Sequence, residues 1–188
     1  MKNKKDFIVE FLRESKSVGA IHPSSKRLTQ KIIKKINFEK SNVIIEYGPG
    51  TGTFTEELIR LKSKNCKLVL FELNLTFFTI LNNKYGHLEN VYIYNESAEK
   101  VVEILAELKI KHVDVIVSSL PLAVIESKIV DKLLINSHNL LSNDGKFIQY
   151  QYSLKSKTKL KHIFSKVKTG FTIRNIPPAF IYECSISE

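Results

Sequence analysis

The residues of this chain with the clearest chemical potential surround three glycines at alternate positions. Glu46 follows the apolar run Val43–Ile45 and precedes Gly48, Gly50 and Gly52. Glycines at this spacing after a strand let the backbone N–H groups of a tight turn approach a nucleotide-like ligand closely. A carboxylate on that turn would repel a pyrophosphate, so it suits a zwitterionic ligand whose amine needs a partner.

A second acid extends the predicted cofactor site. Glu72 lies twenty residues after Gly52, at the end of the next apolar run, and Leu73 follows it. A carboxylate at that point can accept hydrogen bonds from two vicinal ribose hydroxyls. The two acids and the glycines together predict an adenosine-containing cofactor.

The elements that must position these residues alternate between strand and helix. A Thr-x-x-Glu capping box at Thr53 and Glu56 predicts a helix that begins at about Phe54. A turn is predicted at Asn143–Gly145. Alternation of this kind predicts an α/β fold with a mostly parallel sheet, here of seven strands, and helices on both faces. The predicted strands are Val43–Tyr47, Leu68–Phe71, Val91–Tyr94, Val113–Ser118, Lys146–Tyr152, Phe171–Arg174 and Phe180–Ile186.

Ligands of such sheets bind beyond the carboxyl ends of the strands, where Glu46, Glu72 and the pair Ser118-Ser119 all stand. The 188 residues predict one domain, with residues 1–40 as an N-terminal helical extension packed on a core of residues 41–188. Within the extension, the stretch Lys4–Ser15 predicts an amphipathic helix with Phe7 and Phe11 on one stripe. That helix either lies in a membrane interface or packs on its own domain.

The net charge of +10 is unevenly distributed. Residues 1–40 carry +7, residues 41–152 carry −2 and residues 153–188 carry +5. Basic flanks suit a polyanionic partner, either nucleic acid or an anionic lipid surface, although a solvated lysine-rich surface explains them too. No apolar run reaches the roughly 18–20 residues that span a bilayer, and the N-terminus has no signal-peptide pattern. We therefore expect a cytoplasmic protein with free thiols at Cys66 and Cys184 and, given the histidine spacing, no metal site.

The stretch from Glu46 to Gly52 resembles motif I of the class I S-adenosylmethionine (SAM) methyltransferases. The resemblance implies a Rossmann-like fold and SAM as the cofactor. Glu46 and the three glycines would line its methionine part, and Glu72 would hold its ribose. The family often has an acid facing the adenine after the third strand. Ser97, before Ala98, occupies that slot here, and Glu96 is the alternative.

The end of the fourth strand narrows the resemblance. Val117-Ser-Ser-Leu-Pro-Leu122 resembles the Asn-Leu-Pro-Tyr motif of adenine methyltransferases, including rRNA adenine dimethyltransferases, but Leu122 replaces the aromatic residue that stacks on the base. Ser-Leu-Pro-Leu is more similar to the bacterial phospholipid N-methyltransferases, which methylate phosphatidylethanolamine. Three further segments resemble that family: Val18-Gly-Ala-Ile-His-Pro-Ser-Ser25, Gln149-Tyr-Gln-Tyr152 and Arg174-Asn-Ile-Pro-Pro-Ala179.

That resemblance implies roles for four candidate catalytic residues. Ser119, with the Leu120 carbonyl, would orient the acceptor amine. Tyr150 and Tyr152 share one face of a strand and could hold a methylated ammonium, unless that face packs on the core and the intervening glutamines line the site instead. His22 is a candidate proton acceptor, although a lone histidine before Pro-Ser is more often structural.

The leading hypothesis is a SAM-dependent N-methyltransferase of phosphatidylethanolamine or a related amino-phospholipid, positioned peripherally on the inner face of the cell membrane. Its partners would be the anionic membrane surface and the lipid substrate. Two alternatives stay open: an rRNA adenine N-methyltransferase that uses the basic flanks on RNA phosphate, and a SAM-binding protein without activity.

Overall fold

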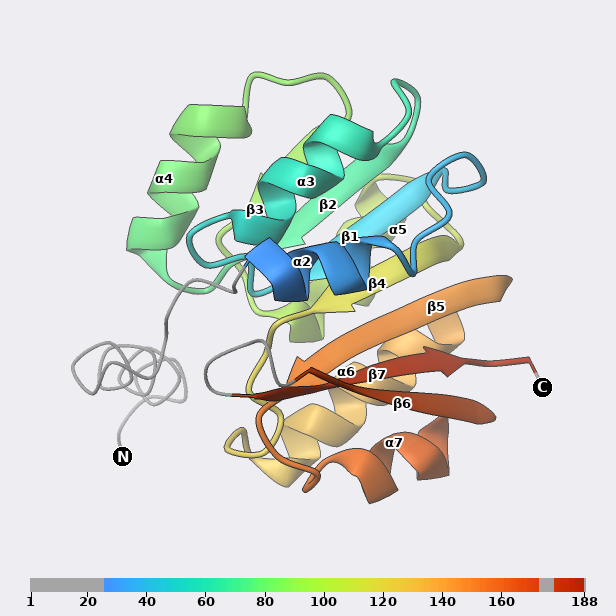
Figure 1. Cartoon of the computed structure of the whole chain (residues 1–188). Helices are drawn as coiled ribbons and strands as arrows, with labels where there is room; N and C mark the ends of the chain where they lie inside the picture. Colours follow the sequence, from blue (N-terminus) through green and yellow to red (C-terminus); the bar gives the residue numbers. More distant parts are fainter. Residues whose placement is uncertain (1–25, 173–177, 188) are drawn as a thin grey trace.

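The computed structural model describes residues 26–172 and 178–187, and shows one twisted sheet with helices on both faces (Figure 1). The predicted helix Lys4–Ser15, the candidate His22 and Arg174, at the end of a predicted strand, lie outside the described residues. Among the residues described, no helix is long and apolar enough to cross a bilayer. The division between an N-terminal extension and a core at residue 40 stays a prediction.

The sheet has seven strands in the order β3-β2-β1-β4-β5-β7-β6. The first five strands of the chain are parallel, and β7 runs antiparallel between β5 and β6. The central strands are apolar and buried on both faces, as helix-covered parallel strands are. The strands are β1 (Val43–Tyr47), β2 (Lys67–Phe71), β3 (Val91–Tyr94), β4 (Val113–Ser118), β5 (Leu141–Gln151), β6 (Lys166–Thr172) and β7 (Ala179–Ser185).

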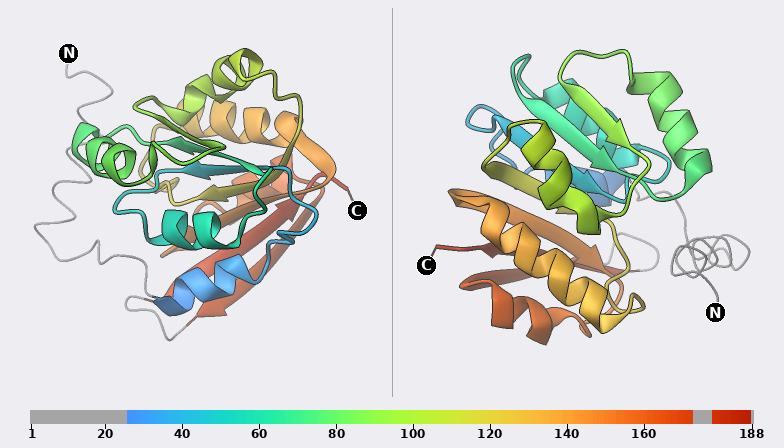
Figure 2. Two further views of the ribbon diagram at one scale, coloured as in Figure 1. Left: turned by 90° about the horizontal axis from the view of Figure 1, so that it is seen from above. Right: turned by 180° about the vertical axis from the view of Figure 1, so that it is seen from behind.

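Two apolar clusters lie on the two faces of the sheet. Figure 2 shows the helices that cover each face, from above and from behind. One cluster lies under α2, α3 and α4, and the other under η1, α5, α6 and α7. The predicted α/β architecture is therefore confirmed. The helices are α2 (Lys26–Ile33), α3 (Thr53–Leu61), α4 (Leu75–Tyr85), the 3-10 turn η1 (Ala98–Lys100), α5 (Val101–Glu107), α6 (Ser127–Leu140) and α7 (Lys157–Ile163).

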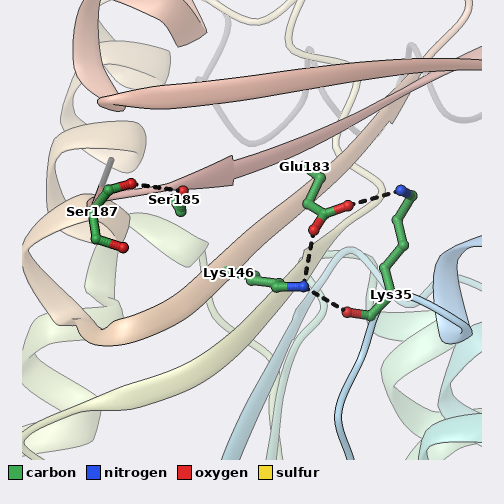
Figure 3. Close-up of polar contacts among 5 residues, drawn as sticks. All are labelled: Lys35, Lys146, Glu183, Ser185 and Ser187. Atoms are coloured by element: carbon green, nitrogen blue, oxygen red, sulfur yellow. Dashed lines mark hydrogen bonds and ion pairs between the residues drawn. The ribbon is translucent and has the colours of Figure 1, made fainter.

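The segment after α2 is tied to the sheet by charge (Figure 3). The Glu183 carboxylate on β7 lies 2.8 Å from Lys35 Nζ and 2.9 Å from Lys146 Nζ on β5. Lys146 also donates to the Lys35 carbonyl at 3.3 Å. With Leu28 and Ile32 fully buried against the sheet, this cluster fixes α2 on its face.

The predicted capping box is wrong. Helix α3 begins at Thr53, and its N-cap is Gly52 in the left-handed conformation, with no side-chain cap. Because Thr53 is already the first helical residue, its hydroxyl is not placed to accept from the amide of Glu56. The glycine turn itself delivers the chain into the helix, so no hydroxyl cap is needed.

The predicted turn at Asn143–Gly145 is also wrong, because β5 runs from Leu141 through those residues. The parallel pairing with β4 shifts register between Val113 and Val115, so the turn-forming residues lie in an irregular part of a strand. At the other end of the chain, β6 starts at Lys166, well before the predicted Phe171, because it pairs with β7 along its whole length.

Candidate functional site

The glycine turn lies between the carboxyl ends of β1, β2 and β4. Gly48 N–H donates to the Phe71 carbonyl at 2.9 Å, and Ser119 N–H donates to the Tyr47 carbonyl at 2.9 Å. The three glycines have φ values of +67°, +58° and +85°, which favour residues without a Cβ. The fold thus gathers the turn, Glu72 and the Ser118-Ser119 pair at one edge, where α/β sheets bind ligands.

Gly50 is the open position of the turn. A Cβ built at Gly50 would meet nothing within 4 Å, whereas one at Gly48 would lie 3.0 Å from Leu120 and one at Gly52 2.8 Å from Leu81. Gly48 and Gly52 are therefore packed from inside the protein. The space above Gly50 is left for something else to approach the backbone.

Glu46 is a buried acid with an unsatisfied oxygen. Its side chain is fully buried, and one oxygen accepts from the Thr55 hydroxyl at 2.7 Å. The other oxygen, Oε1, is buried without a hydrogen-bond partner among the described residues. Burial raises the pKa of Glu46 to about 8; the Thr55 bond opposes this rise, and the nearby Glu72 charge adds to it.

Glu72 is held by backbone amides. Its carboxylate accepts from Gly50 N–H and from Asn74 N–H, each at 2.8 Å. Burial raises the pKa of Glu72, while the bonds from Asn74 and Gly50 oppose that rise. The Leu73 amide is a third backbone donor to this carboxylate. A carboxylate has about four acceptor positions, so acceptor capacity remains for a further donor.

These features fit SAM. Its methionine part carries an ammonium, and Glu46 Oε1 is a buried acceptor that lacks a donor. Its ribose offers two hydroxyl donors, and Glu72 retains acceptor capacity beside the open face of Gly50. An ammonium and ribose hydroxyls from a bound ligand would supply the donors that Glu46 Oε1 and Glu72 lack at this edge.

The two candidates for the adenine contact are both engaged within the chain. Ser97 caps η1, because its hydroxyl accepts from Glu99 N–H at 3.3 Å, and Ala98 behind it is buried. Glu96 forms an ion pair with Lys100 at 3.0 Å. Neither group is placed by these contacts for an adenine amino group.

The loop after β4 is clamped by β5. The Leu120 carbonyl accepts from Gln149 Nε2 at 3.0 Å and from Gln151 Nε2 at 2.8 Å. The same carbonyl also accepts from Leu122 N–H at 2.9 Å. That it orients the acceptor amine stays a prediction. Ser118 is buried, and its hydroxyl accepts from Leu120 N–H at 3.4 Å, whereas Ser119 is only half-buried.

The tyrosines of β5 lie on the opposite face from the glutamines. Tyr150 is half-buried, with its ring centroid 5.7 Å from that of Phe54 and 6.0 Å from that of Tyr152. Tyr152 is exposed directly after the last residue of β5. Tyr150 thus packs partly on the core, whereas Tyr152, the other member of the aromatic pair, lies at the surface. Leu122, where adenine methyltransferases have an aromatic residue, is buried in the core.

Sequence reasoning gave no role to three residues that shape the site. Thr55 holds Glu46, and Asn74 both donates to Glu72 and caps α4 by accepting from Thr76 and Phe77 N–H. The Asn95 side-chain amide donates to the carbonyls of Glu72 and Leu73. An asparagine just before a helix is a familiar N-cap signal and could have revealed Asn74. The described residues contain no cluster of three or more potential metal ligands.

Comparison with protein families and curated proteins places the chain among methyltransferases. Residues 12–162 match the family described as ribosomal RNA adenine dimethylase. The ornithine lipid N-methyltransferase of Singulisphaera acidiphila is 24% identical over 179 residues, which cover 95% of this chain and 93% of that enzyme. Ribosomal RNA small subunit methyltransferase A of Borreliella burgdorferi is 33% identical over 110 residues, covering 58% of this chain but 36% of that enzyme.

A solved structure supports the fold alone. The Burkholderia thailandensis 1,6-didemethyltoxoflavin-N1-methyltransferase, solved with 1,6-didemethyltoxoflavin and S-adenosylhomocysteine, superposes with a TM-score of 0.71 at 13% identity. The superposition covers 98% of this chain and 87% of that one. The seven-stranded sheet and its helices therefore have the arrangement of a known methyltransferase.

Proposed function

The chain belongs to the ribosomal RNA adenine dimethylase family and is a SAM-dependent methyltransferase, and we propose that it methylates the primary amine of a membrane amino lipid. The observation that carries this proposal is the extent of the match to a lipid enzyme. It covers 93% of the ornithine lipid N-methyltransferase, whereas the rRNA enzyme is matched over 36% of its length. Methyltransferase relatives throughout favour an enzyme over a SAM-binding protein without activity.

The loop after β4 supports an amine over a flat base. Stacking on an aromatic side chain contributes about 1–3 kcal/mol per base. Leu122 has no aromatic ring and packs in the core, so it offers no platform on which a base could stack. An alkyl amine has no ring to stack, so it does not need the platform. Phosphatidylethanolamine and ornithine lipid both present such an amine.

The cofactor supplies a methyl group already activated by a sulfonium. One S–C bond breaks as one N–C bond forms, and the lone pair comes from an amine that has lost its proton. We assign Glu46 to the ammonium of the cofactor, and Glu72 to its ribose, with the backbone of Gly48, Gly50 and Gly52 in close approach. The contribution of the protein is to position the two reacting groups.

On the acceptor side, we assign the acceptor amine to Ser119 and to the pair Tyr150 and Tyr152. With the Leu120 carbonyl bound to Gln149 and Gln151, Ser119 is the polar group of this loop that we assign to the acceptor amine. Tyr150 and Tyr152 would hold the product ammonium by cation–π attraction, of order 0.5–2 kcal/mol. The glutamines act as positioning residues that fix the loop.

The test is methyl transfer from radiolabelled SAM to three acceptors run side by side: vesicles with ornithine lipid, vesicles with phosphatidylethanolamine, and bare ribosomal RNA. We expect label in an amino lipid and its loss in Glu46→Gln. The vesicle arms decide which headgroup is preferred.

rRNA adenine methylation is the second candidate, favoured by the 33% identity to an rRNA methyltransferase. Label in RNA and in neither lipid would establish it and overturn the lipid proposal. In that case an aromatic residue other than position 122 would have to supply the stacking, and Tyr152→Ala should then reduce labelling of RNA.

A further inference from the structure

Exposed apolar side chains gather at the carboxyl edge of the sheet. In the described part of the chain, eight large apolar side chains are exposed, and five of them follow or end strands at this edge. We call these five the apolar rim. Its members, with their exposed fractions, are Leu75 (65%), Phe171 (49%), Leu154 (47%), Tyr152 (44%) and Val124 (40%). From this rim we infer that the edge docks on an anionic lipid bilayer.

The topology explains how distant residues form one rim. Leu75 begins α4 just after β2, and Val124 lies in the connection after β4. Tyr152 and Leu154 follow the end of β5. Phe171 on β6 pairs with Phe180 on β7, which pairs with Gln151, the last residue of β5. The rim therefore extends along the same edge that carries Glu46 and Glu72.

Single exposed apolar residues are normal on a protein surface, whereas their accumulation on one edge marks an interaction surface. The other three, Ile80, Val102 and Ile135, lie singly on α4, α5 and α6. They show what the background level of exposure looks like in this molecule. The apolar rim gathers more exposed apolar side chains than this background, and it does so at the edge where the proposed substrate would enter.

The charges beside the rim select a bilayer as the occupant. The exposed Lys31 side chain donates to the Phe171 carbonyl at 3.2 Å, which places an ammonium at the rim. Lys155 and Lys157 follow Leu154 along the chain, and neither forms an ion pair with a described carboxylate. Apolar insertion combined with positive charge is what reversible binding to anionic bilayers requires.

The inference rests on the proposed function in one respect: a rim that surrounds the site on a membrane would let the lipid amine reach Ser119 without leaving the bilayer. It assigns membrane contact to described residues of the core domain. Docking itself needs neither the amine substrate nor the cofactor, so it can be measured without either.

The experiment is flotation of the full-length protein with vesicles of phosphatidylglycerol and phosphatidylcholine, which contain no primary-amine headgroup. The rim variant is Leu154→Ser with Phe171→Ser. The matched control is Ile135→Ser with Val102→Ser, because its side chains are 49% and 46% exposed, as the rim pair is 49% and 47%. We expect the rim variant to lose at least tenfold in partitioning and the control to stay within twofold of wild type. Urea denaturation confirms that both variants are folded.

Equal partitioning of the rim variant and wild type would overturn the inference, because residues outside the rim would then mediate vesicle binding. A wild-type protein that does not float would also overturn it, because the rim would then have an occupant other than a bilayer. Loss of RNA binding in the rim variant with vesicle binding intact would also overturn it. Methyl transfer to a short-chain amino lipid below its micelle concentration should be unchanged in the rim variant. If wild type labels no amino lipid yet the rim variant loses partitioning, the proposed function fails and the docking surface stands.

Discussion

Glu46 and Glu183 are both enclosed acids, yet the fold treats them in opposite ways. Glu183 has two lysine ammoniums at 2.8 and 2.9 Å; burial works to raise its pKa, but the bonds from Lys35 and Lys146 bring it below the usual range. Glu46 has one hydroxyl partner and an unpaired oxygen, and burial raises its pKa to about 8. Glu183 is neutralised by lysines of the chain, whereas Glu46 has no cationic partner among the described residues.

The two regions around these acids differ in the same sense. On the face under α2, the polar groups of Lys35, Lys146 and Glu183 satisfy one another and stabilise the packing (Figure 3). At the carboxyl edge, Glu46 Oε1 and Gln149 Oε1 are buried without partners. The other such side-chain atoms among the described residues are the Tyr85 hydroxyl, at the end of α4, and Thr172 Oγ1, at the end of β6. Unsatisfied buried groups cost stability, so the unpaired Glu46 oxygen supports the proposed ligand site.

Among the substitutions that test the contrast between Glu46 and Glu183, Glu46→Gln should have the largest effect on SAM affinity. The amide keeps the shape but cannot balance an ammonium, so SAM affinity should fall about hundredfold, or about 2.7 kcal/mol. The stability effect should have the opposite sign. The folded pKa of about 8 exceeds the ordinary value of 4.5, so wild-type stability falls as pH rises between these values. The variant should lack that slope and be the more stable protein at pH 9.

Isothermal titration gives the affinity, and urea denaturation at pH 6 and pH 9 gives the stability. Wild-type SAM affinity in the variant would contradict the assignment of Glu46. Parallel stability curves for the two proteins would contradict the raised pKa instead.

Gly50→Ala and Gly52→Ala should separate ligand contact from packing within one turn. At Gly50 the added methyl meets no protein atom, so the strain of positive φ, about 1–2 kcal/mol, is the main stability cost. The methyl occupies the open approach, and SAM affinity should fall at least tenfold. At Gly52 the methyl meets Leu81 at 2.8 Å, so the stability loss should be larger.

Thermal unfolding and SAM titration of both variants measure this contrast. A Gly50→Ala protein that binds SAM as wild type does would mean that the cofactor does not approach that residue. A Gly52→Ala protein as stable as Gly50→Ala would mean that Leu81 moves aside.

Glu183→Gln should have the smallest effect, and it tests the lysine-paired acid in the contrast between Glu183 and Glu46. It removes the charge that pairs with two partly exposed lysines, and the expected loss is about 1 kcal/mol at neutral pH. Because the pKa of Glu183 is lowered, its contribution is present above about pH 4.5 and fades as pH falls further. SAM affinity should stay within twofold. Urea denaturation at pH 7 and pH 3.5 measures the stability loss and its pH dependence. A marked loss of SAM affinity would mean that the Glu183 cluster and the cofactor site are coupled.

Sequence reasoning predicted the strands and the turn that carry the proposed cofactor site because their signals are local. The apolar run, the acid and the three glycines specify a strand, a turn and a helix within eleven residues, and Glu72 ends the next strand. Their convergence follows from parallel pairing, which places the carboxyl ends of β1 and β2 side by side.

The acceptor side depends on long-range pairing and was harder to predict. A period of two places Tyr150 and Tyr152 on one face but cannot say which face that is. Pairing of β5 with β4 and β7 decides it, and sends Gln149 and Gln151 to the Leu120 carbonyl. The capping box failed for a related reason, since Thr53 and Glu56 have the right types but Gly52 already ends the turn.

The burial of Glu46 gives its proposed role in cofactor binding a calorimetric consequence. With its pKa raised to about 8, Glu46 should carry a proton at pH 7 in the free protein. An ammonium that pairs with the carboxylate would displace that proton into the buffer. The apparent heat of binding should therefore differ between phosphate and Tris in proportion to their heats of ionisation, and the slope of that dependence counts the protons released. The Glu46→Gln protein has no such proton to release.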